Sequence, residues 1–355
     1  MEEKQQNERL WYADFLRIIA CAGVVVIHVC GTNWSALEPE SFFWNVLNVY
    51  ESMVRWCVPM FVMLSGMFFL DPRKKVTYHS LFFKNIFRII TAFFFWSAFY
   101  VGVGLIFARR AQTPMGWEEI KTAFLYGNYH QWFLFMVVGL YLITPVVRGF
   151  VKSAGRRDLE YFLGLCAVFT LIVPLFSGIP VLRVLGSYAE RLNLSLLGGY
   201  VGFFVAGYYF RTYEFGRRAR GAIYALGVLG FLVTCVGTYF ASMNWQAPNE
   251  YWYGYLTPNV AAMSVALFVF FKNHVHGEKL SARSKKVLAD LSRCTFGIYL
   301  VHAFLNRLLV EGFQINALSI TPILGVPLIT AAIMAVGYGI IHLLAKIPLF
   351  ARYFM

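Results

Sequence analysis

The sequence predicts an all-α fold, a polytopic membrane helix bundle with about ten transmembrane helices. Apolar residues make up 59% of its 355 residues and charged residues 14%, whereas soluble domains average about 45–50% and 25%. Residues 10–30 form a mostly apolar stretch, and about 20 such residues cross the hydrocarbon core of a bilayer. No soluble segment or internal repeat interrupts this pattern. We therefore expect a single integral membrane domain over residues 1–355.

Hydropathy places the predicted helices in order along the chain. Their approximate bounds are 10–30, 53–70, 84–107, 131–150, 159–176, 195–210, 221–241, 253–271, 294–310 and 321–345. The loop at 108–131 contains MGWEEIKTAFLYG, whose amphipathic pattern predicts a helix lying along the outer membrane surface. Because residues 1–9 are polar and no small-residue cleavage pattern follows the first span, we expect that span to be retained.

The distribution of lysine and arginine predicts the orientation of the bundle. The formal net charge is +13, and positive residues favour cytoplasmic loops. With a cytoplasmic N-terminus, the outer loops hold only Arg109, Arg110, Lys121, Arg183 and Arg191. Both termini are then cytoplasmic, and we expect a multi-pass protein of the inner (plasma) membrane. Topology accounts for the positive charge, so the composition requires no nucleic-acid partner.

Three ionisable residues lie within the first predicted span. Asp14, Arg17 and His28 share one helical face with Cys21, because successive residues of a helix are rotated by about 100°. A charge at the centre of a membrane helix costs about 2.5–3.5 kcal/mol or more unless it faces a polar interior, so this face indicates a functional site. Arg17 and His28 are about 16 Å apart along the axis, which is about half the hydrocarbon thickness.

His28 is the strongest candidate for chemistry. A neutral imidazole in a partly buried site can take a proton from an alcohol at physiological pH. The alternative is a histidine that only hydrogen-bonds a neighbouring helix. We group Asp14 and Arg17 with His28 as catalytic candidates, although an i,i+3 ion pair near the inner end of the helix is a structural alternative for those two.

The ninth span carries a second polar stripe. Thr295, Tyr299, His302 and Asn306 recur at helical spacing within CTFGIYLVHAFLN. Four polar side chains on one face of an apolar helix predict a cavity or a polar interface rather than a lipid-facing surface. Interhelical hydrogen bonding is the expected role of Thr295 and Asn306, whereas Tyr299 and His302 are equally consistent with packing and with a pocket.

A cationic group is predicted at the inner membrane face. Arg73, Lys74 and Lys75 lie in the loop after the second span, and Lys84 and Arg88 follow at the start of the third. Topology alone explains Lys74 and Lys75. Arg88 precedes the apolar residues IITA and is expected below the headgroups, where a guanidinium with five donors suits a phosphate or carboxylate ligand. The simplest ligand is a phosphorylated molecule from the cytoplasm.

Motifs for other chemistries are missing from the sequence. There is no GxxxxGK[ST], HExxH, GxSxG or dinucleotide-binding fingerprint. The six cysteines lie within or at the ends of apolar spans without metal-ligand spacing, which predicts packing roles and no metal: Cys21, Cys30, Cys57, Cys166, Cys235 and Cys294.

Four segments of the chain together resemble the acyltransferase 3 family of integral membrane acyltransferases, and most closely its surface-polysaccharide O-acetyltransferase branch. They are the Arg17-x10-His28 spacing, VPMFVMLSGMFF at 58–69, HQWFLFMVVGLYLITP at 130–145 and TFGIYLVH at 295–302. The resemblance extends over nearly the whole chain. It implies transfer of an acyl group, usually acetyl from cytoplasmic acetyl-CoA, to a hydroxyl of a cell-surface or lipid-linked glycan at the outer face of a bacterial cell envelope.

The resemblance also implies site residues. Arg17 and His28 match the first-span motif, Arg88 matches a third-span arginine, and Tyr299 with His302 matches the late motif. The family often has a proline shortly after the third-span arginine, where this chain has Arg88-Ile-Ile-Thr. Arg88, Arg73, Lys75 and Lys84 are therefore grouped as predicted donor-binding residues. The predicted pocket contains Tyr299, His302, Glu51 and Trp132, of which Glu51 is a candidate to orient His28 and Trp132 is alternatively an interfacial anchor.

Charge and resemblance lead to one predicted mechanism. The CoA nucleotide binds at the basic inner mouth, its pantetheine arm extends between the helices, and the thioester meets His28, which deprotonates an acceptor hydroxyl arriving from outside. An acyl-histidine intermediate is a second option. Two other classes stay open: a transporter of polysaccharide or lipid-linked sugar, and a membrane sensing domain that binds an acyl-CoA or peptide without turnover.

Overall fold

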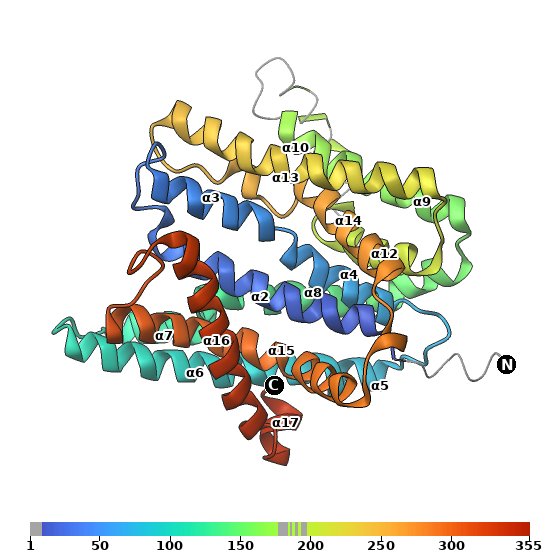
Figure 1. Ribbon diagram of the computed structural model, residues 1–355. Coiled ribbons are helices and arrows are strands. Elements are labelled where there is room, and N and C mark those ends of the chain that lie inside the picture. The colour runs from blue at the N-terminus through green and yellow to red at the C-terminus, as the bar shows by residue number, and fades with distance from the viewer. Residues whose placement is uncertain (1–8, 177–183, 185–186, 189–190, 193–196) are drawn as a thin grey trace.

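The computed structural model is entirely helical over the residues that it describes, which are 9–176, 197–355 and, between them, only 184, 187, 188, 191 and 192. The longer helices form one bundle (Figure 1). They are α2 (Trp11–Trp34), α3 (Phe42–Val54), α4 (Cys57–Phe69), α6 (Phe87–Arg110), α8 (Trp132–Ser153), α9 (Arg156–Cys166), α12 (Val201–Thr212), α13 (Arg217–Trp245), α14 (Pro258–His274), α15 (Ala282–Arg307) and α16 (Pro322–Leu344).

Shorter elements connect the long helices. The α-helical ones are α5 (Tyr78–Ser80), α7 (Trp117–Tyr126), α10 (Val173–Phe176) and α17 (Pro348–Tyr353). Three π-helical segments are η1 (Leu81–Ile86), η3 (Ala167–Ile172) and η7 (Leu308–Gly312), and three 3-10 turns are η2 (Tyr129–Gln131), η5 (Tyr251–Tyr253) and η6 (Gly277–Lys279).

Nine helical segments in the described part of the chain are long and apolar enough to cross a membrane. This confirms the polytopic bundle, although the expected count was about ten. The difference lies at the predicted span 195–210, whose first two residues are outside the described ranges. Its described helix, α12, has 12 residues and is therefore about 18 Å long, which is shorter than the hydrocarbon core of about 30 Å.

The second span begins earlier than predicted. The sequence pattern indicated 53–70, whereas the spanning segment is Phe42–Phe69, formed by α3 and α4 with a break at Arg55 and Trp56. Hydropathy missed α3 because its polar residues lower the local average. These residues are paired inside the bundle: Glu51 forms an ion pair with Arg55, and Asn48 accepts a hydrogen bond from the Tyr253 hydroxyl.

The amphipathic segment after the third span does not match the expected surface helix. Helix α7 packs against α6, and the ring of Phe124 near its end lies 5.7 Å from that of Phe94 in the first half of α6. Near its start, Met115 is close to Gly104 in the second half of α6. Helix α7 therefore runs antiparallel along α6 toward the middle of the bundle, and its apolar face covers α6 instead of lying flat on the membrane.

Helix α2 lies inside the bundle and contacts α3, α4, α14, α15 and α16 (Figure 1). Helices α4 and α12 approach closely through glycine. A Cβ atom on Gly66 would overlap the carbonyl of Phe204, and one on Gly207 would overlap that of Met63. Small residues of this kind let membrane helices pack backbone to backbone. Five of the six cysteines are buried and Cys235 is half-buried, as the predicted packing roles require.

Candidate functional site

The two polar stripes predicted from the sequence face each other across α2 and α15. At the helix ends that the positive-inside rule predicts to be cytoplasmic, called the inner ends here, Ser292 donates a hydrogen bond of 2.6 Å to Asp14. Cys21 Sγ lies 3.5 Å from the Thr295 carbonyl one turn later. Toward the outer ends, Asn306 donates to the His28 carbonyl at 3.2 Å. The two helices therefore run parallel, and their polar faces form one interface rather than two lipid-facing surfaces.

The expected hydrogen bonds of this stripe are correct for Asn306 and wrong for Thr295. Asn306 bonds both His28 and Thr32 of α2. The Thr295 hydroxyl instead donates to the Ser292 carbonyl of its own helix, at 2.8 Å. A threonine in a membrane helix can satisfy its hydroxyl within the helix, so spacing alone could not distinguish these two roles.

Three histidines and two tyrosines gather near the outer end of this interface. We call His28, His130, His302, Tyr129 and Tyr299 the histidine cluster. The ring of His28 is 5.0 Å from the rings of His302 and Tyr129, and the ring of His130 is 5.1 Å from that of His302. Tyr299 donates its hydroxyl proton to the backbone carbonyl of His130. The cluster thus joins residues from α2, η2 and α15.

One tautomer of His302 is fixed by its surroundings. The Nδ1 atom lies within hydrogen-bond distance of the Tyr299 carbonyl. A carbonyl can only accept, so Nδ1 carries the proton and Nε2 is left with a lone pair. In the described part of the chain this buried Nε2 has no hydrogen-bond partner, and neither do the two ring nitrogens of His130. Buried polar atoms without partners are uncommon and costly, so the Nε2 lone pair is available to a ligand or a neighbouring donor.

A small cavity opens beside the cluster. Its volume is about 40 Å³, and its lining includes His28, His130, Tyr299 and Trp132. One water molecule needs about 10–15 Å³ of such space, so the cavity can hold a group of a few heavy atoms. Tyr299 and Trp132 thus line the same cavity as His28, and the His302 ring lies beside that of His28; their role as a substrate pocket stays a prediction.

Glu51 is paired with a neighbouring arginine rather than with His28. Its carboxylate forms a buried ion pair with Arg55, and the Arg55 guanidinium lies 3.9 Å from the centre of the Tyr253 ring. Over the described ranges, the side chain of His28 has ring contacts but no hydrogen bond that would orient it. The His302 ring lies 5.0 Å from that of His28, and a role for Glu51 in orienting His28 stays a prediction.

The inner end of the bundle holds a cluster of positive charges around two aromatic rings. We call Arg17, Lys74, Arg88 and Arg211 the inner cation group. Arg17, Lys74 and Arg211 lie 4.8, 4.3 and 5.9 Å from the centre of the Phe68 ring. Electrostatic interactions link the Tyr141 hydroxyl to both Arg17 and Arg88. Helices α2, α6 and α12 and the loop after α4 thus each supply one cation to this region. Several cations together are well suited to bind several phosphate charges.

The loop that carries Lys74 is held in place by its neighbours. Arg148 donates to the carbonyls of Asp71 and Lys74, at 3.0 and 2.7 Å. Asp71 itself forms ion pairs of 3.0 Å with Arg73 and Arg211. Burial opposes ionisation of Asp71, but the hydrogen bonds from Arg73 and the charge of Arg211 outweigh it and lower the pKa of the carboxyl below its usual value.

Lys74 carries an electrostatic signature of this region. Partial burial and the nearby charge of Arg211 lower the pKa of Lys74 below the usual lysine value, and Asp71 only partly opposes that shift. The local potential therefore stays positive despite the carboxylate. A positive potential that is not neutralised by the protein favours an anionic ligand.

The other predicted donor-binding residues lie around this group with less contact. Arg73 is bound to Asp71 and its side chain is 66% exposed. Lys75 and Lys84 are exposed. Arg88 is exposed as well, with its guanidinium 6.0 Å from the centre of the Phe296 ring. Their role in donor binding stays a prediction.

Asp14 and Arg17 form the ion pair considered from their spacing, at 3.6 Å. Asp14 also accepts a hydrogen bond of 2.6 Å from Arg9 and another from Ser292. It is buried, and it lies 14 residues, or about 21 Å, before His28 on the helix. This arrangement favours a structural role for Asp14, whereas Arg17 also faces Phe68 and the inner cation group.

Sequence reasoning missed three residues of these clusters, of which Tyr129 was not singled out at all. His130 was noted only as part of a motif, although a histidine directly before an apolar span was a signal like that of His28. Arg211 was assigned to topology, because it ends an apolar stretch where the positive-inside rule places arginine anyway. No group of His, Cys, Asp or Glu side chains within the described ranges has the arrangement needed to hold a metal ion.

Comparison with known proteins identifies the family. The family model described as acyltransferase domain, which represents the acyltransferase 3 family, matches residues 10–342. Searches of curated proteins and of solved structures found no match. The matched range contains both the histidine cluster and the inner cation group. The chain therefore belongs to the acyltransferase 3 family, whose members are integral membrane acyltransferases.

Proposed function

We propose that the protein transfers an acetyl group from cytoplasmic acetyl-CoA to a hydroxyl of a cell-surface or lipid-linked glycan at the outer face of the inner (plasma) membrane. One observation carries this proposal: a single helix, α2, connects the two clusters. Arg17 belongs to the inner cation group, and His28, about 16 Å further along the axis, belongs to the histidine cluster. A donor that is charged at one end and reactive at the other fits that separation.

The inner cation group supplies the nucleotide site in this proposal. CoA carries several phosphate charges, and hydrogen bonds from guanidinium to phosphate are charge-assisted and geometrically specific. The sequence predicted this site at Arg88, which the resemblance implies, and at the neighbouring cations Arg73, Lys75 and Lys84. The contacts around Phe68 favour Arg17, Lys74 and Arg211 as well, with Arg88 linked through Tyr141.

The reaction itself needs one proton acceptor and one acyl transfer. His28 removes the proton from the acceptor hydroxyl while the oxygen of that hydroxyl attacks the carbonyl carbon of the thioester. The new ester C–O bond forms, the C–S bond breaks, and the sulfur leaves as thiolate, which takes the proton back from His28 and departs as CoA thiol. The products are the acetyl ester and free CoA, so atoms and charge balance.

His302 assists His28 in this scheme. Its Nδ1 is committed to the Tyr299 carbonyl, so its Nε2 can accept a proton or a hydrogen bond from the neighbouring His28 ring. A hydrogen bond of this kind would fix the His28 tautomer, with the other ring nitrogen free for the acceptor hydroxyl. His302 is thus a positioning residue, comparable to the orienting partner that general-base histidines use elsewhere.

Release of CoA thiol from the purified, detergent-solubilised protein tests the proposal. Thiol should appear only when acetyl-CoA and a glycan acceptor are both present, and the glycan should gain the mass of one acetyl group. A transporter would move sugar across a vesicle membrane without consuming acetyl-CoA. A sensing domain would bind the donor without releasing thiol. Either of these results would replace the proposed activity.

Donor binding can be tested separately with matched arginine variants. Arg211→Ala should weaken CoA binding about 10- to 150-fold, because hydrogen bonds to charged groups contribute about 1.5–3 kcal/mol. Arg218→Ala removes an exposed arginine from the start of α13 and should leave the affinity unchanged. Isothermal titration with CoA measures both. Equal CoA affinity in the two variants would remove Arg211 from the donor site.

A further inference from the structure

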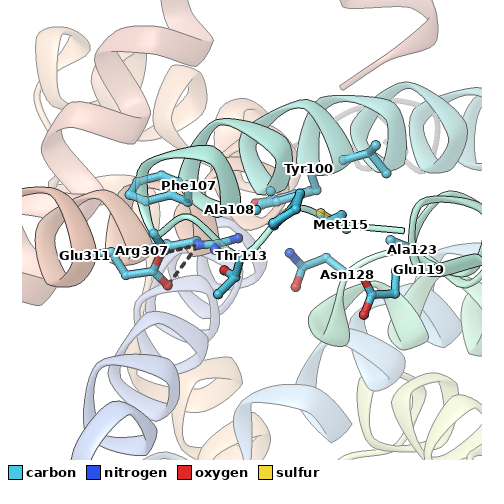
Figure 2. A pocket seen from close by; sticks show the side chains of 15 residues that line it. Tyr100, Phe107, Ala108, Thr113, Met115, Glu119, Ala123, Asn128, Arg307 and Glu311 are labelled. Carbon is cyan, nitrogen blue, oxygen red and sulfur yellow. Dashed lines mark hydrogen bonds and ion pairs between the residues drawn. The ribbon is translucent and has the colours of Figure 1, made fainter. Parts of the chain in front are cut away.

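A second cavity lies at the outer end of the bundle, and it is much larger than the one beside His28. Its volume is about 730 Å³. Figure 2 shows it between the outer half of α6, the connection to α7, and the end of α15 with η7. The Arg307–Glu311 ion pair lies on one side of the opening, and Glu119 and Asn128 lie on the other.

The inner end of this outer cavity approaches the histidine cluster. Tyr100 contributes to the lining, and its ring is 5.2 Å from that of His130. Asn128, another lining residue, directly precedes η2, which carries Tyr129 and His130. The ring of Tyr100 therefore separates the inner end of the cavity from the histidine cluster, where the proposed function places the reaction.

The lining of the outer cavity is mixed, with apolar residues such as Phe107 and Met115 beside charged and polar ones. It contains two carboxylates, Glu119 and Glu311, and one guanidinium, Arg307. Arg307 is held by Glu311 at 2.9 Å and lies 4.8 Å from the centre of the Phe107 ring. Thr113 adds a hydroxyl. Carboxylates accept hydrogen bonds from the hydroxyl groups of a saccharide.

The backbone beside the cavity has an uncommon conformation. Gln112 has a φ of 57°, and its neighbours Ala111 and Thr113 both line the cavity. A residue with a Cβ rarely adopts positive φ, and such positions often occur at binding sites. The conformation turns the chain from α6 back toward α7 and so shapes the outer rim.

We propose that the outer cavity is the acceptor site and that it takes an uncharged, polyhydroxylated saccharide. This inference rests on the proposed function, which needs an acceptor hydroxyl near His28. The size of the cavity fits several sugar units, because ligand sites of about 300–1,000 Å³ bury molecules of that class. Two carboxylates against one guanidinium leave an excess negative charge, which disfavours sugars that carry carboxylates.

Protection of an introduced cysteine tests binding without requiring turnover. The variant Thr113→Cys places a thiol in the lining, and Thr122→Cys places one on an exposed position of α7 outside it. Both are labelled in the full-length, detergent-solubilised protein with a hydrophilic maleimide. The probes are an oligomaltoside, a chito-oligosaccharide and an oligogalacturonate. A neutral probe at ten times its dissociation constant should slow labelling of Thr113→Cys about tenfold, and that of Thr122→Cys not at all.

A filled cavity tests the same inference in the reaction. Ala108→Trp adds a large side chain to the lining, whereas Gly102→Trp adds one on the same helix where a Cβ meets no atom within 4 Å. Ala108→Trp should raise the acceptor KM about tenfold or more without changing CoA affinity. Gly102→Trp should change neither value, which controls for the bulk of tryptophan in α6.

The outcomes separate this inference from the proposed function. Failure of all three oligosaccharides to protect Thr113→Cys would overturn the acceptor site, and so would a wild-type acceptor KM in Ala108→Trp. Protection by the oligogalacturonate alone would overturn the uncharged class. Protection by a neutral probe without any release of CoA thiol would support the cavity as a saccharide site and reject acetyl transfer to that saccharide.

Discussion

The two ends of the interface between α2 and α15 differ in whether their buried polar groups have hydrogen-bond partners. At the inner end, the buried Asp14 carboxylate is bound by Arg9 and Ser292 and paired with Arg17. At the outer end, His28 and His302 meet ring to ring, and the buried Nε2 of His302 has no partner within the described residues. The same pair of helices thus carries one satisfied and one unsatisfied polar site.

From this difference we expect a structural role for the inner end and a functional role for the outer end. Satisfied polar groups stabilise a helix interface, because each donor and acceptor replaces the water that it lost. An unpaired buried nitrogen costs free energy and gives no stability in return. We therefore expect substitutions at the inner end to change stability first and substitutions at the outer end to change turnover first.

The largest effect is expected for His28. The variant His28→Ala should lower acetyl transfer about 10²- to 10⁴-fold, because general-base catalysis contributes that much. The unfolding midpoint and CoA affinity should remain near the wild-type values. His28→Gln keeps a hydrogen-bonding side chain without a useful base, so a similar loss of turnover would indicate proton transfer rather than orientation. Thiol release and isothermal titration with CoA give the two measurements.

Near wild-type turnover in His28→Ala would contradict the functional role that we expect for the outer end of the interface. It would show that the unsatisfied end is only a packing site and would move the search for a base to His302 or His130. The rings of His302 and His130 lie 5.1 Å apart. Each of the two histidines is then replaced singly and assayed in the same way.

The second effect, at the inner end, should appear in stability. Asp14→Ala removes a carboxylate that is hydrogen-bonded to both Arg9 and Ser292. The arginine partners are partly exposed and screened, so we expect a loss of about 1.5–3 kcal/mol in the free energy of unfolding. Turnover per folded molecule should stay within about twofold. Denaturant unfolding in detergent measures the loss, and a selective loss of turnover would make Asp14 a catalytic residue.

The sequence was sufficient to predict the parts of this interface that depend on local spacing. The helical period alone placed Asp14, Arg17 and His28 on one face of α2, and Tyr299 and His302 on one face of α15. Because polar faces avoid lipid, the two stripes could be expected to meet other polar groups inside the bundle. That expectation is confirmed by the contacts between α2 and α15.

Contacts that depend on the relative placement of helices were not accessible from the sequence. His130 joins the cluster only because α7 turns back along α6 and returns the chain to the middle of the bundle. Arg211 joins the inner cation group because glycines let α12 approach α4, which carries Phe68. Glu51 was expected from its position in the sequence to orient His28. Its carboxylate forms an ion pair with Arg55, one turn later on the same segment.

A third, smaller effect distinguishes the inner cations from one another. Lys74 and Lys75 are both exposed, but Lys74 lies 4.3 Å from the centre of the Phe68 ring, beside Arg17 and Arg211. Lys74→Ala should weaken CoA binding up to about fivefold, and Lys75→Ala by less than about twofold, as exposed charges contribute little. The sequence alone had explained both lysines by topology and had also grouped Lys75, but not Lys74, with the predicted donor-binding residues. Equal effects in titrations of the two variants would return Lys74 to that role.

The same lysine predicts a pH dependence. Its pKa is lowered below the usual value of 10.5 by burial and by Arg211. The ammonium is charged below that lowered pKa and neutral above it, so its share of CoA affinity is lost as the pH rises from neutral toward 10.5. In Lys74→Arg the side chain stays charged over this pH range, so its CoA affinity should fall less than that of the wild type as the pH rises. A wild-type profile identical to that of Lys74→Arg would exclude Lys74 from the donor site.

The smallest effect concerns the hydrogen bonds that hold His28 in place. Asn306 donates to the His28 carbonyl and to the Thr32 hydroxyl, both at 3.2 Å, and interhelical hydrogen bonds in membranes average about 0.6 kcal/mol. Asn306→Ala should therefore lower stability by about that amount and turnover by only a few-fold. Thr295→Val is the matched control, because the Thr295 hydroxyl bonds its own helix. A double-mutant cycle of Asn306→Ala with Thr32→Ala isolates the pairwise term, and a coupling energy near zero would show that ring packing alone positions His28.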